Sequence, residues 1–198
     1  RARLCAGRGS FTGAARLCVV GGGLEVAELG RLVRQETLTV FFGKSGLGKS
    51  SILRAGLSPL LRDSDFVPIY IRLNHDETAP RLKEQVEIAI EEVLEEEKID
   101  AAKPVPTESL WEYFHKKNSD RWDADNRLIK PVLIFDQFEE LMTLGQENSV
   151  RASRTANFLN ELEDLVENRP PESLLARFKQ ERGLADQFDH RRSDYRVI

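Results

Sequence analysis

Eight consecutive residues constrain the fold of this chain more than any other feature: Gly43-Lys44-Ser45-Gly46-Leu47-Gly48-Lys49-Ser50. They fit the pattern G-x-x-x-x-G-K-[ST]. They lie between an apolar, β-branched run, Thr37–Phe42, and a helical pattern that begins at Ser50. Glycine tolerates backbone angles that other residues resist, so consecutive N–H groups in such a loop can point at phosphate oxygens. The strand–loop–helix order therefore predicts a phosphate-binding loop (P-loop) within an α/β fold.

The side chains of this loop supply what a nucleoside triphosphate requires. The helix that follows the loop presents its N-terminal N–H groups to the anion. Lys49 provides a positive charge for the β- and γ-phosphates, and Ser50 provides a hydroxyl ligand for Mg²⁺. We therefore expect ATP and Mg²⁺ as the ligands. The expected nucleotide-binding residues are Gly43, Lys44, Ser45, Gly46, Leu47, Gly48, Lys49, Ser50 and Ser51.

A second element, Val132-Leu133-Ile134-Phe135-Asp136, is an apolar strand that ends in a carboxylate. Because open α/β sheets bind ligands at the carboxyl ends of their strands, Asp136 can hold Mg²⁺ together with Ser50. The alternative is an ordinary aspartate that caps the next helix. Hydrolysis also needs a group that orients the attacking water. Glu139 and Glu140 are the catalytic candidates, and the alternative for both is an exposed acid in the first turn of a helix.

Apolar patterns along the rest of the chain alternate between strand and helix. Strands that alternate with helices imply a parallel sheet covered on both faces. The fold class we expect is therefore α/β, a three-layer P-loop NTPase with a mostly parallel sheet. Residues 1–23, rich in Gly, Ala and Arg, predict a loosely ordered lead-in, and 178–192 is a charge-rich stretch. The expected strands are Thr37–Phe42, Phe66–Leu73, Pro131–Asp136 and the start of a fourth at Tyr195–Ile198; the expected helices are Leu24–Gln35, one from Ser50, Arg81–Ile99, one capped by Thr107 that ends at His115, and Asn157–Glu167.

The composition disfavours several classes of protein. Hydrophobic residues make up 40% of the chain and charged residues 31%, which is typical of a soluble globular protein. The net charge of −4 disfavours a nucleic-acid binder that relies on bulk positive charge. No apolar run approaches the ~18 residues that span a bilayer. Cys5 and Cys18 form no zinc or disulfide pattern, which fits a reducing cytoplasm. We therefore expect a cytoplasmic protein with neither a membrane nor a nucleic acid as partner.

Three segments taken together resemble one family: FFGKSGLGKSSILRAGLSPLL, PIYIRL and PVLIFDQFEEL. The combination is similar to the NTPase domain of the novel STAND group (signal-transduction ATPases with numerous domains), which is allied to the AAA+ branch of P-loop NTPases. The resemblance covers residues 19–198, so we expect a lead-in over 1–18 and the NTPase domain over 19–198. Gly43, Gly48, Lys49 and Ser50 match the family's Walker A positions, Asp136 matches the Walker B acid, and Glu139 and Glu140 match the acids after it.

The resemblance implies a nucleotide-operated switch. Such proteins bind ATP, often self-associate on activation and couple this domain to effector and sensor modules. Val19–Glu25 resembles the family's base-contacting box hhGRxxE, with Gly22 where the family has arginine. The family continues into a sensor arginine and a winged helix, so we expect a domain that is incomplete after Ile198. Residue 1 is not methionine and the single methionine is Met142, so we also expect the chain to begin inside a longer protein.

Two other functions stay open from the residues alone. The first is a P-loop enzyme of another class, such as a small-molecule kinase. The second is a nucleotide-bound scaffold that does not hydrolyse ATP. A GTPase is disfavoured because no [NT]-K-x-D string occurs, and an ABC ATPase is disfavoured because no LSGGQ-like string occurs. Multiple-turnover phosphate release separates the ATPase from the scaffold, and phosphate transfer to a second substrate identifies a kinase.

Overall fold

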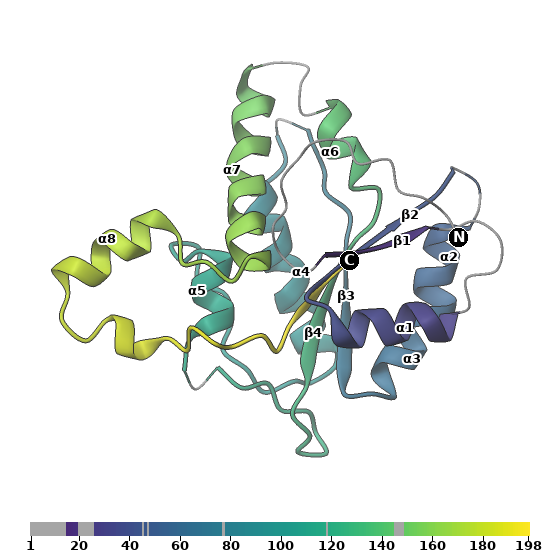
Figure 1. Cartoon of the computed structure of the whole chain (residues 1–198), viewed down its shortest axis with the longest axis horizontal. Coiled ribbons are helices and arrows are strands. Elements are labelled where there is room, and N and C mark those ends of the chain that lie inside the picture. The colour runs from purple at the N-terminus through teal and green to yellow at the C-terminus, as the bar shows by residue number, and fades with distance from the viewer. Residues whose placement is uncertain are drawn as a thin grey trace.

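The computed structural model describes residues 15–19, 26–44, 46, 48–76, 78–117, 119–144 and 149–198, with the backbone alone for residues 15–19 and 144. The described chain is built around a five-stranded sheet with the order β1-β2-β5-β4-β3 (Figure 1). Each pair of neighbouring strands is parallel. The strands are β1 Ala15–Val19, β2 Leu38–Phe42, β3 Phe66–Ile71, β4 Lys130–Phe135 and β5 Arg196–Val197.

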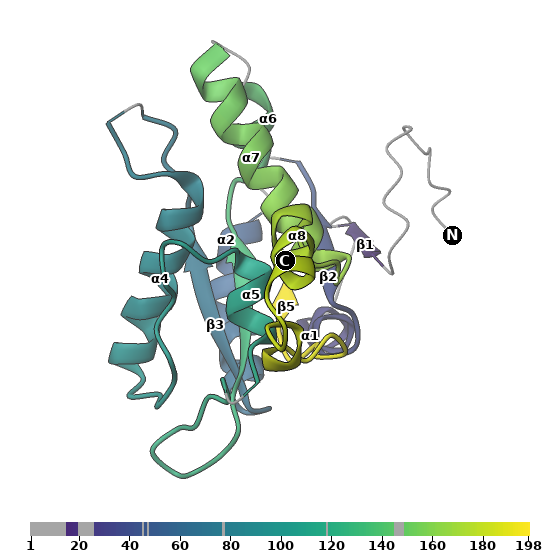
Figure 2. The ribbon, with the colours of Figure 1, turned by 90° about the vertical axis from the view of Figure 1, so that its left-hand side faces the viewer.

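The order of the strands brings the two predicted motifs to one edge of the sheet. β3 and β4 pair along their whole length, with Tyr70 opposite Ile134. β5 lies between β4 and β2, and its Val197 is opposite both Leu133 and Leu38. In Figure 2 the strands follow one another across the view from β3 to β1. Because β2 and β4 are parallel and only one strand separates them, the segments that follow them lie close together at the carboxyl edge.

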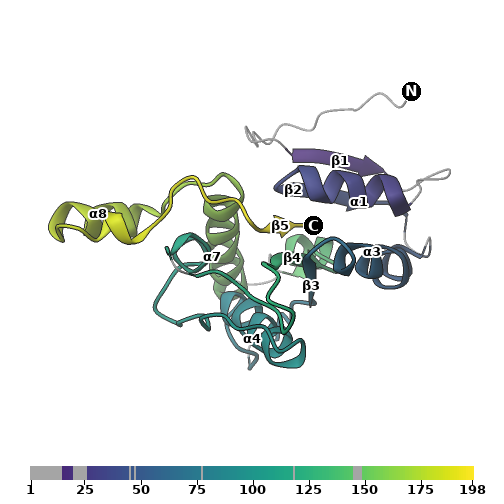
Figure 3. The same cartoon turned by 90° about the horizontal axis from the view of Figure 1, so that it is seen from below.

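Helices cover both faces of the sheet, and successive residues of β4 point to opposite faces. Val132 and Ile134 join a core with apolar residues from α1 and from the helix after the P-loop. Leu133 and Phe135 join a core with residues of α4, α5 and α7. Figure 3 shows α1 and α3 on one side of the strands and α4 and α7 on the other. The predicted three-layer α/β fold is confirmed. The helical segments are α1 Val26–Gln35, α2 Lys49–Ser51, the π-helix η1 Ile52–Leu57, α3 Ser58–Arg62, α4 Leu82–Glu96, α5 Leu110–His115, α6 Glu139–Leu144, α7 Ser149–Val166, α8 Glu172–Gln180 and the 3-10 helix η2 Ala185–Gln187.

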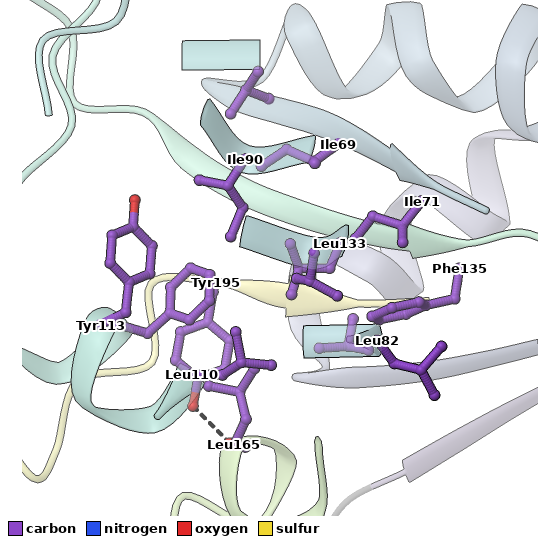
Figure 4. Close-up of a cluster of buried hydrophobic side chains, with 14 of the residues drawn as sticks. Ile69, Ile71, Leu82, Ile90, Leu110, Tyr113, Leu133, Phe135, Leu165 and Tyr195 are labelled. Atoms are coloured by element: carbon purple, nitrogen blue, oxygen red, sulfur yellow. Dashed lines mark hydrogen bonds between the residues drawn. The ribbon is translucent and has the colours of Figure 1, made fainter. Parts of the chain in front are cut away.

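The core under α4, α5 and α7 is drawn in Figure 4. Leu82 and Ile90 of α4 pack with Leu133 of the sheet, and all three are almost fully buried. Tyr195, which directly precedes β5, is also buried here, and its hydroxyl donates a 2.8 Å hydrogen bond to the carbonyl of Leu165 in α7 (Figure 4). This contact fixes the last strand to the helical layer, so β5 enters the sheet between the two strands that carry the motifs.

The helix that follows the P-loop is continuous from α2 through η1 to α3, and its middle turns are π-helical. Pro59 has no N–H to donate and its ring crowds the carbonyl of the preceding turn, which accounts for a widened turn before it. The carbonyl of Leu53 accepts hydrogen bonds from both the N–H and the hydroxyl of Ser58, five residues later. Gly56 in this segment lies against Val26 of α1, since a Cβ there would be 2.7 Å from Val26 Cγ2.

The predictions for the lead-in and for the start of α5 were wrong. Part of the lead-in, predicted to be loosely ordered, forms strand β1, which pairs in parallel with β2 from Ala15 opposite Leu38 onward. β1 is an edge strand of five residues and pairs with a neighbour on one side. Such a short edge strand has little recognisable pattern in the sequence. The cap of α5 is Ser109, not Thr107: the Ser109 hydroxyl accepts from the N–H of Glu112, whose carboxylate accepts from the N–H of Ser109. This reciprocal capping box places the helix start two residues later.

The structure contains helices that the sequence patterns did not predict. α8 was not expected, α6 was considered only in the alternative that places Glu139 and Glu140 in the first turn of a helix, and α7 begins at Ser149, earlier than the predicted Asn157. α8 projects away from the sheet in Figures 1 and 3. It is held by Leu174, which is buried beside Trp111, and by an ion pair of 2.8 Å between Arg177 and Glu112. Only one residue of α8 is buried. The helix therefore lacks the regular spacing of apolar residues by which a helix is predicted from sequence.

Candidate nucleotide-binding site

The P-loop connects β2 to α2 at the carboxyl edge of the sheet. Ser45 and Leu47 lie outside the described residues. Gly46 and Gly48 have φ values of 83° and 75°, in the left-handed region that favours glycine. The carbonyl of Gly48 accepts the N–H of Ile52 at 2.9 Å, which is the first hydrogen bond of the following helix. The chain therefore turns from strand to helix at the two glycines, so the start of α2 is directed at the loop.

Lys49 folds back over the loop that precedes it. Its Nζ donates to the carbonyl of Gly43 at 2.8 Å and approaches the carbonyl of Lys44 at 3.4 Å. An ammonium has three hydrogens, so this group can hold the loop and still offer a charge to an anion. The side chain of Lys44, by contrast, is exposed. Of the two lysines in the motif, only Lys49 is positioned against the loop backbone.

Ser50 and Asp136, 86 positions apart in the sequence, are in direct contact. The Ser50 hydroxyl donates a 3.0 Å hydrogen bond to Oδ1 of Asp136. Asp136 follows the last residue of β4, and its N–H donates to the carbonyl of Ile71 at 3.0 Å, so the β3–β4 ladder extends to it. The serine oxygen keeps its lone pairs available for a cation, while its hydrogen is used by the carboxylate.

This pair of oxygen donors fits Mg²⁺. The ion favours hard oxygen ligands and keeps several waters, so one or two protein groups together with phosphate oxygens are sufficient. Within the described residues there is no group of three or more His, Cys, Asp or Glu side chains that could hold a metal ion.

The two acidic catalytic candidates lie in the first turn of α6, directly after Asp136. Gln137, which separates them from the aspartate, has a φ of 59° and begins this turn, and its carbonyl accepts the N–H of Glu140 at 2.9 Å. Glu139 is exposed. Glu140 is half-buried and lines a hollow of about 400 Å³ at the carboxyl edge of the sheet. The other residues that line this hollow are Arg72, Leu73, Asn74, His75, Asp76 and Arg151.

Tyr70 and Arg54 were not predicted to belong to the site. Tyr70, the penultimate residue of β3, has its ring under the guanidinium of Arg54 from η1, with 4.6 Å between Cζ and the ring centroid. Burial of the phenol and the nearby negative charge of Asp136 raise the pKa of Tyr70 to about 12. The tyrosine therefore stays neutral at ordinary pH. The only signal in the sequence was a hydroxyl within the otherwise aliphatic run Pro68–Ile71.

The predicted base-contacting box falls largely outside the described part of the chain. Only Val19 of Val19–Glu25 is described, as the last residue of β1. Across the described residues, no helix is both long enough and apolar enough to cross a membrane.

Of three comparisons with known proteins, one identifies a family. Searches of curated proteins and of solved structures gave no significant match. A family model described as Novel STAND NTPase 1 matches residues 10–180. The match includes the P-loop, the strand β4 that precedes Asp136 and the helices between them, so it covers most of the chain. This chain belongs to the Novel STAND NTPase 1 family.

Proposed function

We propose that this domain binds ATP together with Mg²⁺ and hydrolyses it, and that the bound nucleotide switches the conformation of a signalling protein. The observation that carries the proposal is the direct contact between Ser50 and Asp136 beside a lysine folded over a glycine-rich loop. A hydroxyl, a carboxylate and an ammonium at the start of one helix are the groups that an Mg²⁺–triphosphate requires. The family membership supports nucleotide binding in general.

Each residue has a distinct role in this proposal. The N–H groups at the start of α2 bind phosphate oxygens, and Lys49 neutralises charge on the β- and γ-phosphates. Ser50 and Asp136 would hold the ion, which when bound offsets the negative charge of the phosphates. Glu139 or Glu140 orients the attacking water and accepts its proton. We favour Glu140 of the two, because it is half-buried and lines the hollow that Arg72–Asp76 and Arg151 also line, whereas Glu139 is exposed.

The switch itself is proposed from the family membership. We propose that ATP binding favours self-association and that the full protein joins this domain to effector and sensor modules. We also propose that it works in the cytoplasm, since Cys5 and Cys18 show no disulfide pattern.

A phosphate-release assay tests hydrolysis. The parent protein should release phosphate over many turnovers with Mg²⁺ and not with EDTA. In Asp136→Asn, the difference in phosphate release between Mg²⁺ and EDTA should largely disappear. Glu139→Gln and Glu140→Gln should both still bind ATP, and Glu140→Gln should slow turnover by about 10²–10⁴-fold. Tight binding without turnover in the parent would favour a scaffold instead. Phosphate transfer to a small molecule would favour a kinase.

A further inference from the structure

The hydroxyl of Tyr70 is buried without a hydrogen-bond partner among the described residues. A buried hydroxyl without a partner destabilises a fold, because it has given up hydrogen bonds to water. A phenylalanine would fill the same space without this penalty. Two other tyrosines in the structure behave differently: Tyr195 donates to the carbonyl of Leu165, and Tyr113 donates to the carbonyl of Ala102. The hydroxyl of Tyr70 thus makes no well-formed hydrogen bond among the described residues, although the guanidinium of Arg54 lies near it.

The sheet register places Tyr70 and Asp136 on the same face. Tyr70 is opposite Ile134, and both belong to the core shared with α1 and η1. Residues two apart on a strand point to the same face of the sheet, so Asp136 lies on the same face as Ile134. It is therefore the diagonal neighbour of Tyr70 on the adjacent strand. The N–H of Asp136 bonds to the carbonyl of Ile71, which keeps the two strands paired at this point. The negative charge of Asp136 is close enough to act on the phenol.

Arg54 connects the tyrosine to the helix of the P-loop. It lies four residues after Ser50 on a continuous helical segment, so the two side chains are on one side of it. Ser50 contacts Asp136, and the guanidinium of Arg54 stacks on the ring of Tyr70. The ring of Tyr70 is therefore held between β3 and this helix, one turn from the serine and beside the carboxylate.

We propose that Tyr70 is a positioning residue of the metal site, whose hydroxyl donates to the carboxylate of Asp136, directly or through one water, when nucleotide and Mg²⁺ are bound. This inference rests on the proposed function. Ser50 already donates to Oδ1 of Asp136, and among the described residues no side chain donates to Oδ2. A donor to the second oxygen would fix the orientation of the carboxylate. Groups that orient metal ligands in this way typically change metal affinity by about 10–100-fold.

The test compares Tyr70→Phe with the parent and with Tyr113→Phe, using a non-hydrolysable ATP analogue. Mn²⁺ replaces Mg²⁺ so that electron paramagnetic resonance reports the free and bound ion directly. We expect Tyr70→Phe to weaken Mn²⁺ binding to the nucleotide complex about tenfold. Its affinity for the analogue in EDTA should stay at the parental value. Tyr113→Phe, whose hydroxyl bonds to a distant carbonyl, should leave both quantities unchanged.

Thermal unfolding separates this role from simple packing. Tyr70→Phe should melt at or above the parental temperature, because it removes a buried hydroxyl that has no partner. Tyr195→Phe should melt lower, because it loses the hydrogen bond to Leu165. Parental Mn²⁺ affinity in a folded Tyr70→Phe variant would overturn the inference and leave the proposed function intact. A parent protein that binds the analogue equally with metal and with EDTA would overturn both.

Discussion

Replacing Gly48 with alanine tests whether the P-loop must take the conformation seen here in order to bind a nucleotide. Gly48 has φ 75° and ψ 23°, and a Cβ added to it would meet no atom of the described residues within 4 Å. Against the part of the chain that the structure describes, the substitution therefore adds no steric clash, and its cost comes from the backbone. An L-residue in the left-handed helical region is disfavoured by about 1–2 kcal/mol.

The effect on ATP affinity depends on whether this conformational cost raises the free energy of the free loop or of the nucleotide-bound loop. The free loop of the variant can relax to another conformation, so the cost of about 1–2 kcal/mol falls on the bound state. At 1.4 kcal/mol per tenfold change, Gly48→Ala should weaken ATP binding by about 5–30-fold. Isothermal titration calorimetry with Mg²⁺–ATP measures this change directly, and circular dichroism of the same sample checks that the variant is folded.

Gly183 provides a matched control. Its φ of 83° is in the same region, and a Cβ there would also meet no described atom within 4 Å, but it lies in the segment between α8 and η2, away from the P-loop. Gly183→Ala should lower the free energy of unfolding by about 1–2 kcal/mol and leave ATP affinity unchanged. Equal ATP affinity in the parent and in Gly48→Ala would refute the reasoning, because the loop conformation would then be irrelevant to binding.

Two further predictions concern stability. Ser109→Ala should lower the free energy of unfolding by about 1 kcal/mol through loss of the α5 cap, whereas Thr107→Ala should change it little; urea unfolding that gives equal losses would contradict the capping assignment. Burial lowers the pKa of His115 from its usual value of 6.5. Below about pH 6.5 the unfolded chain binds a proton that the folded chain does not, so this residue destabilises the fold as pH falls. Between pH 7 and pH 5, the free energy of unfolding of His115→Phe should therefore fall less than that of the parent. Equal decreases in the two proteins would show that His115 does not destabilise the fold at low pH.

The parts of the site that were predicted from sequence follow from local patterns. The P-loop and the strand that ends at Asp136 each occupy a short contiguous segment, so their place at a strand's carboxyl end can be read directly. Their contact required only that β2 and β4 be parallel and close in one sheet, which alternating strands and helices already implied. The strand β5 between them was predicted from Tyr195–Ile198, although its pairing on both sides could not be read from those residues.

The parts that were missed depend on contacts between distant segments. Tyr70 and Arg54 come together only because β3 packs under the helix after the P-loop, and neither residue has a motif around it. The cap of α5 depended on whether Thr107 or Ser109 could reach a glutamate three residues later, and only Ser109 has one, at Glu112. α8 is stabilised by an ion pair and a small aromatic cluster rather than by a long apolar face.

Calorimetric titration of ATP into Lys49→Ala, with Lys44→Ala as its control, tests the central claim most directly. Lys49 contacts the loop backbone, whereas the side chain of Lys44 is exposed at a variable position of the motif. A hydrogen bond to a charged group is worth about 1.5–3 kcal/mol, so Lys49→Ala should weaken ATP binding by about 10–150-fold. Lys44→Ala should keep an affinity close to that of the parent. Parental ATP affinity in a folded Lys49→Ala variant would contradict the assignment of this loop as the nucleotide site.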